Sequence, residues 1–340
     1  MSGVDNIITS VQQTQPQHVL NPELLTTVRL DLRGRRFTVD RDTLMNLPES
    51  ILLCLFPNGL VLSRVGGGGT SSGGSQWSDG GEDGEDDYLY AVDFDPDCFH
   101  FVINFFHHSR DEFYGSNERP GPFHAQAALV DPSNPIPNDF TGSRNPLLTK
   151  QAIIVLREEL EYFVIPPAGA DGLPVKKFTD DAGIANEEHL GLKRQCGGHL
   201  LEMTSIFTAL QRNVNKENNI AEQHLIDMLC MSGFDRNDAW GFRAIEPSRC
   251  CISSIALVLL KTGISHLDNG EVLVDQVQMG TAQKLLLFWR KPARKCWWDG
   301  VEVEVNVGGE RKQVKLWARR VWTLELSLVR IQFPLTIVFC

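Results

Sequence analysis

The sequence predicts an α+β fold in two parts. In the first part short strands lead into helices, and in the second part helices lead into an antiparallel meander. Residues 28–32 and 36–40 alternate apolar and polar side chains on either side of Arg33-Gly34, which predicts a β-hairpin. From residue 200 to residue 231 apolar side chains recur at helical spacing, and from residue 285 onwards the pattern is that of strands. A chain of 340 residues is long enough for roughly two domains.

Breaks in the pattern divide the chain into segments. Residues 1–24 are rich in Gln, Thr and Asn and predict a disordered arm. We assign residues 25–166 to the first domain, 167–195 to a linker and 196–340 to a second, α+β domain. Two flexible insertions are expected inside the first domain, one rich in Gly, Ser and acidic residues and one rich in Pro, at about 60–87 and 110–146.

Helices and strands within these domains follow from the apolar spacing. Helices are predicted over 96–107, 149–163, 200–210, 219–231 and 251–260. Strands are predicted over 285–289, 301–307, 314–317 and 322–329, with a turn at Gly308-Gly309. Asp95-Pro96 is typical of a helix N-terminus. Leu52 and Phe99 lie on apolar helical faces, so we expect both in the core.

Composition and charge are those of an ordinary globular protein. Hydrophobic residues make up 42% of the chain and charged residues 22%, enough to bury a core. The net charge is −11, but the run 79–87 alone carries six acidic residues. The acidity is therefore partly local, and the chain as a whole does not predict nucleic-acid binding.

Cysteine usage and the chain start predict a cytoplasmic protein. The eight cysteines are scattered among apolar neighbours, which suits a reducing compartment better than a disulfide framework. The N-terminus has no basic stretch followed by an apolar one, so no signal peptide is predicted. No apolar run reaches the ~18–20 residues of a membrane span. We expect contact with the plasma membrane only through a partner.

Four segments occur in the order found in a known domain type. They are the opening hairpin, a Pro-Glu-Ser helix start, an Asp-Phe-Asp-Pro helix start and an apolar-acidic segment, at 28–37, 48–56, 93–105 and 156–166. Together they resemble the BTB/POZ domain of the potassium-channel-tetramerisation type. One departure is that the family's Gly-Gly turn is Arg33-Gly34 here.

The two insertions and the C-terminal extension narrow this resemblance. The whole chain resembles the fungal stress-response and growth-regulation ("whiskey") family. That resemblance implies a non-enzymatic adaptor in stress or nutrient signalling that acts with a plasma-membrane-associated phosphatase, and a BTB domain that self-associates or docks a partner. The alternative is a substrate-recruiting adaptor of a cullin-type ubiquitin ligase, because many related BTB domains dock cullins.

One short motif raises the question of an enzyme. Cys230 and Arg236 have the Cys-x5-Arg spacing of a tyrosine-phosphatase loop. However, Cys230 ends a helical pattern instead of a strand, and Asp235 would place a negative charge inside a phosphate cradle. No nucleophile, base and orienting group come together in the sequence, so no enzyme and no cofactor are predicted.

A second set of residues has the ligand types of a zinc site. His224, Cys230, Cys250 and Cys251 nearly match the zinc spacing of channel tetramerisation domains, but they lie outside the BTB segment. Six residues along a helix correspond to ~240° of rotation beyond full turns, so His224 and Cys230 would not share a face. We therefore favour core cysteines over a metal site.

The C-terminal strands are rich in tryptophan and in basic residues. Residues 290–320 contain nine bases against four acids. Such a pattern is typical either of a sheet with a Trp-lined core and a charged outer face, which we favour, or of a binding surface. If it binds, an acidic protein segment or anionic lipid head groups would suit it as well as nucleic acid. The candidate partner-binding residues are Arg311, Lys312, Lys315, Arg319 and Arg320.

Overall fold

The computed structural model describes nine stretches of the chain, with gaps between them. These are residues 27–56, 89–115, 119, 121–127, 145–165, 187–217, 219–267, 271–307 and 309–329. The predicted N-terminal arm, the insertion at about 60–87, most of the insertion at 110–146 and residues 167–186 of the predicted linker lie outside them.

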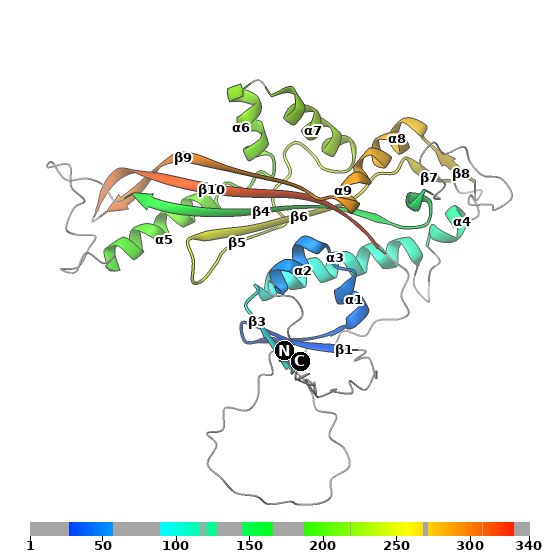
Figure 1. Cartoon of the computed structure of the whole chain (residues 1–340), viewed down its shortest axis with the longest axis horizontal. Coiled ribbons are helices and arrows are strands. Elements are labelled where there is room, and N and C mark those ends of the chain that lie inside the picture. Colours follow the sequence, from blue (N-terminus) through cyan, green and yellow to red (C-terminus); the bar gives the residue numbers. More distant parts are fainter. Residues whose placement is uncertain are drawn as a thin grey trace, which may run out of the picture.

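The N-terminal lobe, residues 27–115, combines a small sheet with three helices (Figure 1). Its strands have the order β2-β1-β3, with β1 antiparallel to β2 and parallel to β3. The elements are β1 (Thr27–Leu32), β2 (Arg35–Asp40), α1 (Arg41–Met45), α2 (Glu49–Leu55), β3 (Leu89–Val92) and α3 (Pro96–Tyr114). The predicted hairpin is confirmed, and the helix predicted to start at Pro96 is longer than expected.

The main sheet has five antiparallel strands in the order β5-β6-β4-β10-β9. They are β4 (Ala152–Ile165), β5 (Phe242–Ile245), β6 (Cys251–Leu259), β9 (Ala293–Val307) and β10 (Glu310–Leu328). The turn predicted at Gly308-Gly309 is confirmed by the pairing of Val307 with Glu310 and by the positive φ of 91° at Gly309.

Helices and small elements surround this sheet. They are α4 (Phe123–Ala127), η1 (Pro146–Leu148), α5 (Glu187–Leu201), α6 (Thr208–Glu217), α7 (Ile220–Met231), β7 (Ile264–His266), β8 (Val272–Val274), α8 (Gln276–Leu285) and α9 (Leu287–Arg290). Figure 1 shows the N-terminal lobe on one side of the sheet and α6 and α7 on the other.

Alternate residues of β4 belong to different cores because successive side chains of a strand point to opposite faces. Ile153 and Val155 pack with Phe99 of α3, in the core that joins the N-terminal lobe to the sheet. Ile154 and Leu156 pack on the opposite face with α6 and α7, and further along that face Leu160 and Tyr162 pack with α5. Phe99 is buried as predicted, whereas Leu52 is only partly buried at the margin of its core.

The helix predicted over 149–163 is wrong, because this segment contains most of strand β4. The residues that seemed to form one helical stripe lie on two faces, with Ile153 on one and Leu156 on the other. A central strand covered on both faces is apolar at successive positions and loses its alternation. The fourth segment of the BTB resemblance is therefore a strand.

Three further predictions are wrong for related reasons. The predicted helix over 251–260 is β6, which is also covered on both faces. The predicted strand at 285–289 lies at the junction of α8 and α9, and the predicted helix over 200–210 is split between α5 and α6. Helix α7 matches the prediction at 219–231, and the strand predicted at 301–307 is the second half of β9. The two strands predicted at 314–317 and 322–329 are one continuous strand, β10, which ends at Leu328.

The main sheet draws strands from both predicted domains. β4, from the segment 25–166, is hydrogen-bonded to β6 on one side and β10 on the other, and both of these belong to 196–340. Helix α5 also begins inside the segment that we assigned to the linker. The two segments therefore share one sheet.

Candidate interaction surface

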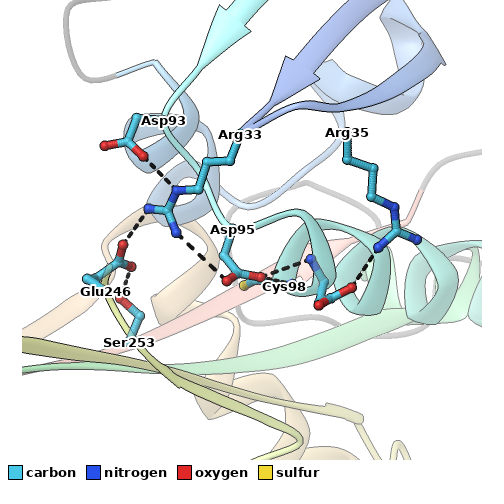
Figure 2. Close-up of polar contacts among 8 residues, drawn as sticks. Arg33, Arg35, Asp93, Asp95, Cys98, Glu246 and Ser253 are labelled. Carbon is cyan, nitrogen blue, oxygen red and sulfur yellow. Dashed lines mark hydrogen bonds and ion pairs between the residues drawn. The ribbon is translucent and has the colours of Figure 1, made fainter. Parts of the chain in front are cut away.

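A polar junction ties the β1–β2 turn to the main sheet (Figure 2). Arg33 has a φ of 51°, in the left-handed region that the family's glycine would occupy without strain. Its Nε donates to Asp93 Oδ1 at 2.6 Å, and its Nη2 pairs with Glu246, which follows β5. Nη1 lies 3.8 Å from Asp95 Oδ2. The departure from a Gly-Gly turn thus supplies a side chain that links the two parts of the molecule.

A buried ionic network lies beneath α5 and α6. Glu158 of β4 accepts hydrogen bonds from Nη1 of Arg243 at 3.1 Å and from Nη1 of Arg320 at 2.9 Å. Nε of Arg320 is 3.6 Å from Asp299, which also pairs with Arg212. Arg320 is 5% exposed. Its charge is therefore compensated inside the protein, and the structure places this candidate residue out of a partner's reach.

The other candidate basic residues are divided between the two faces by strand alternation. Arg311, Lys315 and Arg319 are exposed on the face opposite α5, and Lys312 is on the same side of β10 as Arg320. Nε of Arg319 pairs with Glu161 across the β4–β10 ladder at 3.0 Å. The five candidates therefore do not form one basic surface.

Large apolar side chains gather on the same exposed face. Phe163 and Ile165 of β4 are 48% and 42% exposed, Trp298 of β9 is 55% exposed and Trp317 of β10 is 43% exposed. We call these four residues the aromatic face. A contiguous exposed apolar patch on a folded protein marks a site of interaction.

The ladder register holds the aromatic face together. Phe163 pairs with Trp317, and the rings of Phe163 and Trp298 meet with their centroids 5.8 Å apart. Gly300 lies opposite Trp317, where a Cβ atom would stand 3.9 Å from the Trp317 ring. Nζ of Lys315 lies 5.7 Å from the centroid of the Trp317 ring. The face therefore presents aromatic rings with their charged neighbours close beside them.

Sequence reasoning found part of this surface and missed its main residues. Trp298 and Trp317 were expected in a Trp-lined core, a place that Trp322 occupies with 0% exposure. The dipeptide Trp297-Trp298 was the available signal, because adjacent residues of a strand point to opposite faces. Phe163 was hidden by the mistaken helix over 149–163, which placed it on a buried stripe.

The amino-acid sequence is similar, along most of its length, to those of known fungal proteins. No protein-family model matches the chain. A WHI2-like protein of Schizosaccharomyces pombe is 32% identical, over 95% of this chain and 96% of its own length. The chain belongs to the WHI2-like family. A "Growth regulation protein" of Saccharomyces cerevisiae is 27% identical, over 94% of this chain and 95% of that protein. The WHI2-like similarity therefore covers both the N-terminal lobe and the main sheet.

The phosphatase-like spacing of this WHI2-like chain does not form an anion cradle. Cys230 lies in the last turn of α7, and burial raises the pKa of its thiol, which disfavours the thiolate. Arg236, which would hold phosphate in such a loop, pairs with Asp227. The two residues therefore lack the electrostatics of a nucleophilic site.

The four zinc-ligand candidates are separated between two cores. Cys230, on α7 with His224, packs against the core of α6 and α7, whereas Cys250 packs against the core beneath α5. Cys251 is buried in β6. Among the residues that the structure describes, no three His, Cys, Asp or Glu side chains are grouped so that they could hold a metal ion. Within the same residues, none of the helices combines the length and apolar character of a membrane span.

Proposed function

We propose that this WHI2-like chain is a non-enzymatic adaptor in growth or stress regulation, and that it holds a protein partner on the aromatic face. The role in growth rests on the growth-regulation relative and on the WHI2-like family to which the chain belongs. The partner we propose is a phosphatase, as the family resemblance implies. The protein acts in the cytoplasm and meets the plasma membrane through that partner.

The single observation that carries the binding site is the exposure of two tryptophans beside a phenylalanine on one sheet face. Tryptophan is among the residues that contribute most to protein–protein binding when it becomes buried at the centre of an interface. An aromatic side chain buries about 150–250 Å² when it is fully covered, and about half of that remains for a partner to cover at Phe163, Trp298 and Trp317. Such a face favours a binding protein over an enzyme, which would need converging polar groups in a cleft.

Charge contributes less to this surface than the sequence indicated. Arg319 is already paired with Glu161, and Lys315 lies opposite Glu302 across the β9–β10 ladder. Exposed pairs of this kind are worth roughly 0–1 kcal/mol and are screened by salt. We therefore expect Arg319 and Lys315 to add little to partner binding, which should depend mainly on the rings.

The N-terminal lobe supplies the second half of the proposal. We propose that it has the BTB fold and that it provides self-association or a further docking surface. Its hairpin, the parallel strand β3 and the helices α1 to α3 are in keeping with this fold. Arg33 and the shared core would then fix the N-terminal lobe in place relative to the main sheet.

Affinity capture with the full chain tests the adaptor. The double variant Trp298→Ala/Trp317→Ala removes two rings of the aromatic face, and Trp289→Ala is the matched control because Trp289 is 37% exposed on α9. We expect mass spectrometry to find a phosphatase with the wild type and the control, and to find it at least about tenfold depleted with the double variant. If the double variant captures the same proteins as the wild type, the aromatic face is not the binding site. Capture of a cullin in place of a phosphatase would assign the chain to ubiquitin-ligase recruitment.

A further inference from the structure

Strand β9 forms one edge of the main sheet, and it is hydrogen-bonded to β10 along its inner side. It is 15 residues long. In the described chain, no backbone hydrogen bond joins β9 to an element other than β10. A long strand with an unpaired edge is a template on which another strand can form.

The register identifies which backbone groups of β9 are unpaired. Val307 and Glu310 flank a two-residue turn, and the pair that closes such a turn is hydrogen-bonded. Bonded and non-bonded pairs alternate along an antiparallel ladder. The even-numbered residues of β9 therefore direct their N–H and C=O groups away from β10. Trp298, Gly300, Glu302 and Glu304 are among them.

The two faces of β9 differ in chemistry. Glu302 and Glu304 are exposed on the side of the aromatic face, whereas Val303 and Val305 are buried beneath α5 on the other side. Across the ladder Glu302 lies opposite Lys315, but Glu304 lies opposite the uncharged Gln313. An added strand would thus place one set of side chains beside acidic residues and the other beside valines.

We propose that the open edge of β9 binds an extended segment of a partner protein by strand addition, and that this segment alternates basic with β-branched apolar residues. The inference rests on the proposed function, because it states how an adaptor's partner engages the sheet beside Trp298. Opposite charges on neighbouring strands stabilise their pairing, and like charges weaken it. A second copy of β9, paired antiparallel in the register of fullest overlap, would set Trp298 opposite Glu302 and Cys296 opposite Glu304. Self-pairing in that register gives the two carboxylates no opposite charge, so the charge pattern favours a basic partner.

A synthetic peptide makes the inference testable with the purified full chain. The probe is a fluorescein-labelled peptide of about ten residues that alternates lysine and valine, long enough to cover most of β9. We expect saturable binding by fluorescence polarisation. A peptide with glutamate in place of lysine, and a peptide methylated on alternate backbone nitrogens, should each bind about tenfold more weakly or worse.

Two substitutions at one exposed position separate strand addition from charge attraction. Glu304→Pro removes an outward N–H, which the ladder to β10 does not use, so proline is compatible with an edge strand. Glu304→Thr removes the same charge and keeps the N–H. We expect Glu304→Thr to weaken peptide binding a few-fold and Glu304→Pro to abolish it, while both variants keep the melting temperature of the wild type within a few degrees.

Three results would overturn the inference: equal binding of the N-methylated peptide, equal binding by Glu304→Pro and Glu304→Thr, or no saturable binding of the lysine-valine peptide. The first two would leave a merely electrostatic contact. Because the peptide assay uses purified protein, it can fail while Trp298→Ala/Trp317→Ala still loses its captured partner. The opposite outcome, peptide binding without any captured partner, would refute the adaptor role and leave the edge site standing.

Discussion

Arg319 and Arg320 are adjacent in β10 and lie in opposite environments. The side chain of Arg319 is 44% exposed and pairs with Glu161 in contact with solvent. Arg320 is enclosed with Glu158 and Asp299. A charge in the interior is stabilised only when it is paired, so removing one member of a network weakens the compensation of the charges that stay buried. Two consecutive arginines therefore contribute differently to the free energy of unfolding.

This contrast gives a prediction for stability. Arg320→Met should lower the free energy of unfolding by about 1–3 kcal/mol, because Glu158 then keeps only Arg243 as a partner and Asp299 keeps only Arg212. Arg319→Met, the matched control, should cost less than about 1 kcal/mol. Urea unfolding followed by circular dichroism measures both. Equal losses in the two variants would mean that the network around Glu158 does not stabilise the fold.

At the scale of elements, burial on both faces decides which helices and strands can be recognised from sequence. β9 and the start of β10 have one exposed face, so their alternation predicted them. The start of β4, residues 152–156, and β6 are covered on both faces, and both strands were taken for helices. Their β-branched residues, such as Ile153 and Val155, were the remaining evidence for strands. The aromatic face could not be predicted without β4, because Phe163 comes from it.

A side chain of β10 also serves a helix of the other lobe. Both carboxylate oxygens of Glu325 accept backbone N–H groups at the start of α2, from Glu49 at 2.6 Å and from Ser50 at 3.0 Å. Burial, the largest cause, raises the pKa of Glu325, and the bonds from Ser50 and Glu49 only partly offset it. The helix start thus depends on a group that takes up a proton more readily than usual.

The pKa shift predicts a pH dependence. Because the folded state binds the proton more tightly than the unfolded state, the wild type gains stability as the pH falls through the raised pKa of Glu325. Glu325→Gln cannot titrate and lacks this gain. The melting temperature of Glu325→Gln relative to wild type should therefore be highest near neutral pH and decline as the pH approaches 4.5, the ordinary value for the group. A difference that stays constant with pH would contradict the shift.

Loss of the acceptors themselves provides the control. Glu325→Ala removes both oxygens and leaves the N–H groups of Glu49 and Ser50 without this partner. It should destabilise the protein by about 1–3 kcal/mol at neutral pH. If Glu325→Ala and Glu325→Gln behave alike, the hydrogen bonds to α2 contribute little.

On the scale of the whole molecule, the N-terminal lobe and the main sheet share a core. Phe99 and Val102 of α3 pack in one cluster with Ile153, Val155 and Ile255 of the sheet. Sequence reasoning treated the two segments as separate domains, and it could not predict this contact. Apolar spacing within one segment carries no information on which distant segment covers it, and the assignment of β4 to a helix removed the surface on which α3 packs.

The shared core predicts that the two parts unfold together. Phe99 is 0% exposed in the N-terminal lobe, and Phe99→Ala should cost about 3–5 kcal/mol through the lost packing and the cavity it leaves. Every tryptophan that the structure describes lies at or beyond residue 240, within the part that carries the main sheet. If the shared core makes the N-terminal lobe and the main sheet unfold together, tryptophan fluorescence should show a single transition. Its midpoint should be lowered by the full loss of stability in Phe99→Ala. Leu53→Ala on α2, where the side chain is 57% exposed, should leave that midpoint nearly unchanged. The N-terminal lobe and the main sheet unfold independently if Phe99→Ala leaves the tryptophan midpoint unchanged while circular dichroism shows an additional transition at lower denaturant.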